Sequence, residues 1–184
     1  MRIVAGQAKG RRLATPADGT RPTSDRAREG LFNSLEATMR LAGARVLDLF
    51  AGTGAVGLEA LSRGAAAAVL VESNRRAVEV LRRNVAAVGL PGAEVVAAPV
   101  SRYLSTPPDA PFDLVFADPP YALEDTKIRA VLAALSGDGW VVPGGYVVVE
   151  RSSRAAPSGW AADLITPVRE KRYGEALLWY GRRR

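Results

Sequence analysis

The sequence predicts an α/β fold built on a mostly parallel, seven-stranded sheet that an antiparallel hairpin completes at the carboxyl end. Two patterns lead to this prediction. From Arg45 onward, short apolar segments of strand length alternate with segments of helical periodicity, which is typical of a parallel sheet covered by helices on both faces. The last two apolar segments are instead separated only by a short charged stretch that ends in Tyr173-Gly174, and this indicates an antiparallel pair.

The strands are expected where apolar residues run almost without interruption. Leu114-Val115-Phe116 is one such run, and its lack of alternation indicates a strand buried on both faces. By this criterion we expect strands at residues 45–50, 68–72, 93–97, 112–117, 145–150, 162–168 and 175–181. Between them we expect helices at residues 55–63, 74–88 and 124–135 and a short helical turn at residues 100–104.

Residues 1–40 do not follow this alternation and are expected to form a small extension. Two short strands at residues 2–5 and 11–14 are predicted to pair as a basic hairpin. We therefore divide the chain into an amino-terminal hairpin and helix extension, residues 1–40, and a main domain, residues 41–184.

The helix of the extension has a clear start. Residues 20–25 are rich in turn-forming side chains, and Ser24 can cap a helix that extends to about Met39. The apolar residues of this segment share one helical face, which consists of Ala27, Leu31 and Leu35.

The composition excludes many kinds of chemistry. The 184-residue chain has neither cysteine nor histidine, which excludes disulfides, thiolate nucleophiles, Ser-His-Asp triads and imidazole metal ligands, so no metal is expected. No apolar signal segment opens the chain, and its longest apolar run, residues 65–71, is too short to cross a bilayer. We therefore expect a soluble, cytoplasmic protein with no membrane partner.

The net charge of +6 is unevenly distributed. Residues 1–40 carry a net charge of +4 and residues 151–184 a net charge of +5, whereas residues 41–150 carry −3. Arginine, which binds phosphate groups through two parallel hydrogen bonds, makes up 22 of the 25 basic residues. This distribution favours a nucleic acid held by the two basic ends, with the chemistry in the middle.

The residues from Val46 to Gly57 carry the strongest local signal, a strand followed by a glycine turn and a helix. Gly52, Gly54 and Gly57 satisfy the spacing G-x-G-x-x-G, and Glu72 lies 20 residues after Gly52, at the end of the next expected strand. Because this is the fingerprint of a dinucleotide site, a nicotinamide-dependent oxidoreductase is one interpretation.

Asp48 favours a different ligand. Its carboxylate lies inside the expected strand, four residues before Gly52, where it would repel a pyrophosphate but can pair with the ammonium group of S-adenosylmethionine. Hydride transfer also commonly needs an acid–base partner, and histidine is absent. The pattern Asp48-x-Phe50-x-Gly52-x-Gly54 resembles the first motif of the Rossmann-like methyltransferases, in which Glu72 would bind the ribose hydroxyls.

Asp118-Pro119-Pro120-Tyr121 directly follows the expected strand at residues 112–117. The two prolines fix the backbone and place the Asp118 carboxylate and the Pro119 carbonyl at the carboxyl edge of the sheet, where open α/β sheets bind ligands. These two acceptors can hydrogen-bond both hydrogens of a nucleobase amine and direct its lone pair at a methyl donor. Tyr121 can stack on a base that is turned out of its helix.

With these motifs the chain resembles the bacterial 16S ribosomal RNA guanine-N2 methyltransferases of the small-subunit methyltransferase D type. The resemblance covers essentially the whole chain. Its most diagnostic parts are Arg2 to Gly6, Lys9 to Leu13 and Thr20 to Asn33, because adenine and cytosine amino-methyltransferases share the other two motifs. It implies a Rossmann-like class I methyltransferase fold and S-adenosyl-L-methionine as donor. The implied acceptor is the N2 amine of guanine in 16S rRNA, at nucleotide 966, on the assembled or assembling small subunit.

The resemblance also implies the roles of individual residues. The donor-binding residues would be Asp48, Phe50, Gly52, Thr53, Gly54, Glu72 and Ser73. The residues that hold the target base would be Asp118, Pro119, Pro120 and Tyr121. The chain departs from the family after the third strand, where a polar residue commonly binds the adenine amine. Backbone groups near Ala98 and Val100 would have to hold the adenine instead.

Lys9, Arg11 and Arg12 are the candidates for contacts to RNA phosphates. The sequence leaves open whether residues 21–33 contact the donor or the RNA, and the carboxyl-terminal Arg182 to Arg184 are expected to be a frayed end. We expect a monomer. Two alternatives remain, a DNA adenine-N6 methyltransferase and a non-catalytic RNA-binding module. No segment is large enough to read duplex DNA, and a pure binder has no need for converging amine acceptors.

Overall fold

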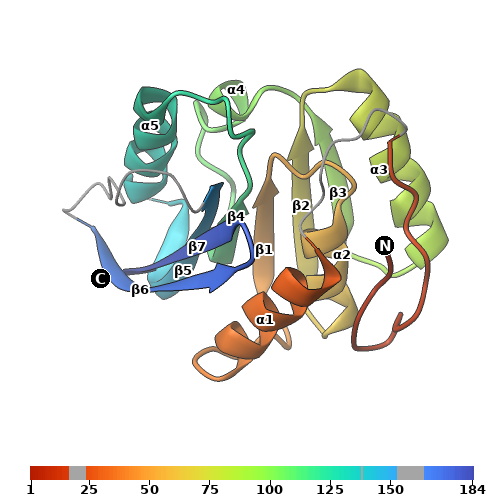
Figure 1. Ribbon diagram of the computed structural model, residues 1–184. Coiled ribbons are helices and arrows are strands. Elements are labelled where there is room, and N and C mark those ends of the chain that lie inside the picture. Colours follow the sequence, from red (N-terminus) through yellow and green to blue (C-terminus); the bar gives the residue numbers. More distant parts are fainter. Residues whose placement is uncertain (17–23, 138, 153–163) are drawn as a thin grey trace.

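The computed structural model describes residues 1–16, 24–137, 139–152 and 164–184. In these residues the strands are β1 (Arg45–Leu49), β2 (Ala67–Glu72), β3 (Ala93–Ala97), β4 (Phe112–Ala117), β5 (Val141–Ser152), β6 (Ile165–Tyr173) and β7 (Ala176–Arg183). They form one sheet with the order β3-β2-β1-β4-β5-β7-β6. The pairs from β3 to β5 are parallel, whereas β7 lies antiparallel between β5 and β6, as Figure 1 shows.

The helices are α1 (Asp25–Glu36), α2 (Ala55–Ser62), α3 (Arg75–Val88), α4 (Val100–Tyr103) and α5 (Asp125–Ser136). Local sequence fixes several of their ends. The Ser24 hydroxyl accepts a hydrogen bond from the Ala27 N–H and caps α1, and Asn74 caps α3 in the same way. Gly89, at φ 61°, ends α3 in the left-handed conformation that glycine adopts most easily.

The sheet separates two hydrophobic cores. On one face, α1, α2 and the amino-terminal residues Ile3, Ala8 and Leu13 pack against the sheet. On the other face, α4 and α5 pack against a second cluster, which includes Leu47 and Leu49 of β1. Because residues from the extension lie in the first core, residues 1–16 and α1 are packed onto the main domain rather than folded apart from it.

The structure confirms the predicted mostly parallel sheet and its carboxyl-terminal antiparallel hairpin. Every expected strand from residue 45 on and every expected helix is present, with ends that differ by a few residues. The largest differences are at β6, which continues to Tyr173 rather than ending at residue 168, and at β5, which begins at Val141 rather than at residue 145. The Pro143-Gly144-Gly145 stretch looks like a turn, but it is an irregularity within the strand, where the register against β4 shifts.

Two expectations about the ends of the chain need correction. The amino-terminal hairpin has no extended strands and is reduced to a single antiparallel bridge between Arg2 and Arg12. The prediction of a frayed carboxyl end is wrong, because β7 continues to Arg183 and the Arg184 N–H donates to the carbonyl of Leu164 at 3.0 Å. Antiparallel pairing with both neighbours satisfies the backbone there and holds the end in the sheet.

Some predictions lie outside the described residues. These are residues 20–23 of the expected turn and the first two residues of the strand expected at 162–168. Among the residues that are described, no helix combines the length and apolar character needed to span a bilayer.

Candidate active site

The predicted site residues gather where four neighbouring strands end. At this edge the chain segments that leave the strands are tied to one another by backbone hydrogen bonds. The Ala51 N–H donates to Val71 O at 3.0 Å, and the Ala98 N–H donates to Glu72 O at 3.1 Å. The Asp118 N–H donates to Leu49 O at 3.3 Å, so the acceptor motif after β4 begins beside the glycine loop after β1.

The glycine loop has the unusual backbone that its sequence predicts. Gly52 and Gly54 have φ values of 54° and 78°, and Phe50 has a φ of 61°, a conformation that costs free energy for an aromatic residue. A Cβ at Gly54 would lie 2.3 Å from a methyl carbon of Leu81, so α3 packs directly against the loop. At Gly52 the nearest atom to such a Cβ would be 3.9 Å away, so space is open above this glycine.

Asp48 lies in the middle of the sheet rather than at its surface. The side chain is buried, and its Oδ2 accepts a hydrogen bond of 2.9 Å from the Gly57 N–H in the first turns of α2. The pKa of Asp48 is raised from 3.8 to about 8, chiefly by burial; the hydrogen bond from the Gly57 N–H lowers it in part, and the negative charge of Glu72 contributes to the rise. In the structure Asp48 therefore supports the glycine turn from below, and its predicted pairing with an ammonium group remains a prediction.

Glu72 links the glycine loop to the start of α3. Its Oε2 accepts from the Gly52 N–H at 2.9 Å, and its Oε1 accepts from the N–H groups of Ser73 and Asn74, each at 2.8 Å. A carboxylate has about four acceptor positions, so these three bonds fix its orientation and leave room for a further donor. The placement at the carboxyl end of β2 is the one expected for a residue that binds ribose hydroxyls.

The two residues expected near an adenine differ in what they can offer. The Ala98 N–H is already bonded to Glu72 O, so only its carbonyl is available for a ligand. The Val100 side chain is buried in the core beneath α4, and its backbone lies in the first turn of that helix. Any contact from these positions would therefore come from backbone groups, as the sequence predicts.

The Asp118 to Tyr121 motif leaves the sheet at the same edge. Asp118 is half-buried, and Pro119 is buried and anchors the turn, whereas Tyr121 has half of its surface exposed to solvent. An exposed aromatic ring next to a half-buried carboxylate is the arrangement that a flat, polar ligand such as a nucleobase requires.

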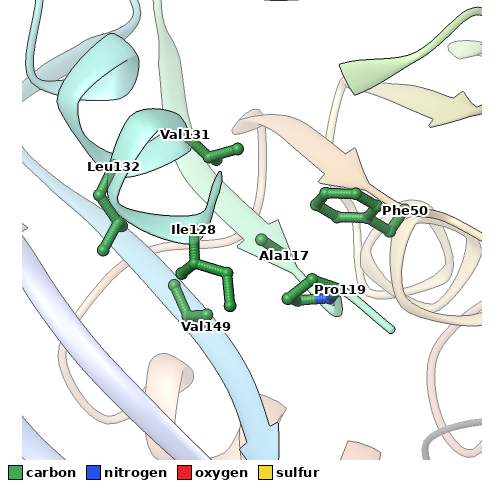
Figure 2. A pocket seen from close by; sticks show the side chains of 7 residues that line it. All are labelled: Phe50, Ala117, Pro119, Ile128, Val131, Leu132 and Val149. Carbon is green, nitrogen blue, oxygen red and sulfur yellow. The ribbon is translucent and has the colours of Figure 1, made fainter. Parts of the chain in front are cut away.

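A small, partly open apolar hollow lies beneath this motif. Figure 2 shows the Phe50 ring and Pro119 on one side of it and α5 on the other. Its lining residues are Phe50, Ala117, Pro119, Ile128, Val131, Leu132 and Val149. The left-handed backbone at Phe50 thus places its ring against the acceptor motif and joins the two halves of the site.

Asn84, which the sequence analysis did not single out, connects the glycine loop to the amino-terminal segment. Its amide group is buried in α3, donates to Thr53 O at 2.9 Å and to Ala14 O at 3.0 Å, and accepts from the Ala14 N–H at 2.8 Å. The Thr53 hydroxyl itself lies 3.8 Å from the sulfur of Met1. The signal that could have revealed Asn84 is a polar residue on the apolar face of an amphipathic helix.

A buried ion-pair cluster around Glu59 also escaped the sequence analysis. Glu59 accepts hydrogen bonds from the N–H groups of Val4 and Ala5 and pairs with Arg28 and Arg63. The cluster fastens the start of the chain to α2 and α1. A lone carboxylate in a helix of Ala, Leu and Val was the available signal, since a buried charge of this kind needs partners.

The three residues expected to contact RNA lie together on the amino-terminal segment, and all are exposed. Arg11 already has a structural role, because its guanidinium donates to the carbonyl of Val88 and, at 3.4 Å, to that of Ala87 at the end of α3. A cation at this position interacts favourably with the helix dipole. Lys9 and Arg12 have no side-chain partner among the described residues, and all three phosphate contacts remain predictions.

Comparison with known proteins places the whole chain in one family. The family model described as "Conserved hypothetical protein 95" matches residues 1–182. Ribosomal RNA small subunit methyltransferase D of Escherichia coli (strain K12) is 38% identical over 169 residues, which cover 88% of this chain and 81% of that protein.

Solved structures agree. The structure of a putative methyltransferase, yhhF, from Escherichia coli matches with a TM-score of 0.84 at 36% identity, covering 100% of this chain and 97% of that one. A hypothetical protein from Thermus thermophilus matches with a TM-score of 0.80 at 37% identity, covering 98% of each chain. Together with the sheet order, these matches confirm the expected Rossmann-like class I methyltransferase fold.

Proposed function

The chain belongs to the family described as conserved hypothetical protein 95, which includes the ribosomal RNA small subunit methyltransferase D proteins, and from this membership we propose its reaction. The protein is an rRNA methyltransferase that uses S-adenosyl-L-methionine. It acts on the N2 amine of a guanine in 16S rRNA, at nucleotide 966, on the assembled or assembling small subunit. It works as a monomer in the cytoplasm, where that substrate is found.

The residues at the glycine loop fit the donor. The space above Gly52 admits a ligand close to the backbone, and Glu72 is held at the rim of that space by the Gly52 N–H. Asp48 lies beneath the loop and supplies negative charge when it is ionised. When bound, the donor supplies a methyl group on a positively charged sulfur. Ser73 and the backbone near Ala98 and Val100 complete the contacts that we propose for its ribose and adenine.

The acceptor side of the site needs no covalent intermediate. The Asp118 carboxylate and the Pro119 carbonyl accept hydrogen bonds from the guanine amine, which draws its lone pair out of conjugation with the ring. Tyr121 stacks on the base and fixes its plane. The amine nitrogen then forms a bond to the methyl carbon as the carbon–sulfur bond breaks, and the nitrogen releases one proton to Asp118 or to water. Positioning and electrostatics account for the rate enhancement.

One observation carries this proposal. The Asp118 N–H is bonded to Leu49 O, the residue just before the glycine loop, and Phe50 and Pro119 line one apolar hollow. This proximity supports a single site that the donor loop and the amine-acceptor motif share. Had they opened on different surfaces, no methyl group could pass between them.

The direct test is to identify the product. The protein is incubated with donor labelled in the methyl group and, separately, with protein-free 16S rRNA, small ribosomal subunits and DNA. Each nucleic acid is then digested to nucleosides. We expect labelled N2-methylguanosine from rRNA or subunits and none from DNA. Labelled N6-methyladenine from DNA would establish the alternative methyltransferase, and no label in any acceptor would favour a non-catalytic RNA-binding module.

A further inference from the structure

Helix α3 exposes a strongly basic side that the proposed reaction does not use. Its outward positions hold four arginines and one acidic residue, Glu79. Lys9 and Arg12, also exposed, lie on the amino-terminal segment beside the far end of the helix. We refer to these six basic residues together as the α3 face, which consists of Lys9, Arg12, Arg75, Arg76, Arg82 and Arg83.

Hydrogen bonds join α3 to the candidate active site at one end and to the amino-terminal segment along the rest of its length. The α3 face therefore extends from one to the other. The first residue of α3 closely follows Glu72 and Ser73, which lie beside the proposed donor site above Gly52. At its last turn the Val88 carbonyl accepts from Arg11, and Asn84 binds Ala14 midway between. Figure 1 shows the amino-terminal segment running alongside α3. With a rise of about 1.5 Å per residue, the 14 residues of α3 extend about 20 Å away from the proposed donor site.

Three arginines of α3, Arg75, Arg82 and Arg83, differ from the arginines that the fold uses for structural contacts. Arg28, Arg63 and Arg151 form ion pairs with acidic side chains. Those at the carboxyl end, such as Arg182, donate to backbone carbonyls. Within the described part of the chain, no ion pair or side-chain hydrogen bond involves the guanidinium groups of Arg75, Arg82 or Arg83. Hydrated guanidinium groups of this kind are well suited to bind phosphates bidentately.

We propose that the α3 face binds the phosphate backbone of the RNA substrate and holds the RNA so that the target guanine reaches Asp118. This inference rests on the proposed function, because it assumes an RNA substrate. It changes the expected RNA contacts: Arg11 serves to fix the segment to α3, and Lys9 and Arg12 extend a surface whose centre is Arg82 and Arg83.

The test compares two double variants with the same loss of charge. Arg82→Ala/Arg83→Ala removes the centre of the α3 face. Lys171→Ala/Arg172→Ala removes two exposed basic residues from β6, at the opposite edge of the sheet from β3. Binding to protein-free 16S rRNA is measured over a range of KCl concentrations, and thermal unfolding checks that each variant is folded.

For the α3 variant we expect about tenfold weaker binding at physiological salt. We also expect a slope of log K against log [KCl] that is smaller by about 1.5, because two phosphate contacts are lost. The β6 variant should bind as the wild type does, which would revise the prediction from the charge distribution that both basic ends hold the nucleic acid. An unchanged slope in the α3 variant, or an equal loss in both variants, would overturn the proposal.

Methyl transfer separates this inference from the function on which it rests. At limiting RNA concentrations the α3 variant should transfer methyl groups more slowly than the wild type, because it binds the RNA more weakly. If the wild type transfers no methyl group to RNA while the α3 variant still loses affinity for RNA, RNA binding by the α3 face is supported and the proposed reaction is refuted. If the wild type methylates RNA and the α3 variant binds RNA as tightly as the wild type does, the proposed reaction is supported and RNA binding by the α3 face is refuted.

Discussion

At the scale of single residues, the fold gives Asp48 a hydrogen-bond partner that its sequence motif does not indicate. The sequence indicated a carboxylate at a donor site, and its place inside an apolar strand of a sheet covered on both faces agrees with the burial that β1 shows from Val46 to Leu49. Its partner, the Gly57 N–H, could not be predicted, because the contact depends on how α2 turns back over the strand. Asn84 was missed for a similar reason, since two of its hydrogen bonds reach across 70 positions of the chain.

The raised pKa of Asp48 gives a prediction about stability and pH. A carboxyl whose pKa is higher in the folded protein binds its proton more tightly there, so it lowers the free energy of unfolding as the pH rises from about 4 to about 8. Asp48→Asn keeps an acceptor for the Gly57 N–H and removes the charge. We expect the variant to be more stable than the wild type by about 1 kcal/mol or more near pH 8, and equally stable near pH 4.

Urea unfolding at the two pH values, without donor, measures this difference. Calorimetry with S-adenosylmethionine provides the second readout, since loss of the carboxylate should weaken donor binding. If the free energies of unfolding of the two proteins change in parallel with pH, Asp48 does not titrate in this range and the argument from burial is wrong.

At the scale of secondary structure, most of the fold could be predicted because the patterns are local. Apolar runs, the Ser24 cap and the glycines predicted the helices and strands to within a few residues. The failures occur where distant contacts decide the outcome. Antiparallel pairing holds Arg182 and Arg183 in β7, and the amino-terminal segment follows α3 and α2 instead of forming a regular hairpin.

The link between α3 and the amino-terminal segment leads to a second prediction. Asn84→Ala would remove three hydrogen bonds, one to the buried Thr53 carbonyl and two partly buried ones to backbone groups of Ala14, so we expect a loss of about 3 kcal/mol in the free energy of unfolding. The KM for the donor should also rise, because Thr53 belongs to the glycine loop. Both effects can be measured by urea unfolding and steady-state kinetics.

Asn74→Ala is the matched control. Like Asn84, Asn74 hydrogen-bonds backbone groups, here in the first turn of α3, but it is exposed at the start of the helix. Loss of this cap should cost about 1 kcal/mol. If Asn84→Ala costs no more than the control, the amide does not hold the segment and the loop together.

At the scale of the whole molecule, the sheet brings the loop proposed to bind the donor and the motif proposed to accept the amine to one edge, with the basic α3 face beside them. The order β3-β2-β1-β4 places the carboxyl ends of four strands side by side, so motifs that lie about 70 residues apart in the sequence meet at one edge. This meeting point could be predicted, because parallel strands with helical crossovers have few possible arrangements. The direction of each side chain at the site could not, because it depends on packing.

The central claim is that Asp118 acts on the acceptor amine and not on the donor. Transfer from labelled S-adenosylmethionine to 16S rRNA should therefore be measured for Asp118→Ala together with its donor affinity. We predict a rate of methyl transfer that is about 10²- to 10³-fold lower, with a donor Kd close to that of the wild type. Methyl transfer by this variant at the wild-type rate would contradict the proposed role of Asp118 as an acceptor for the amine.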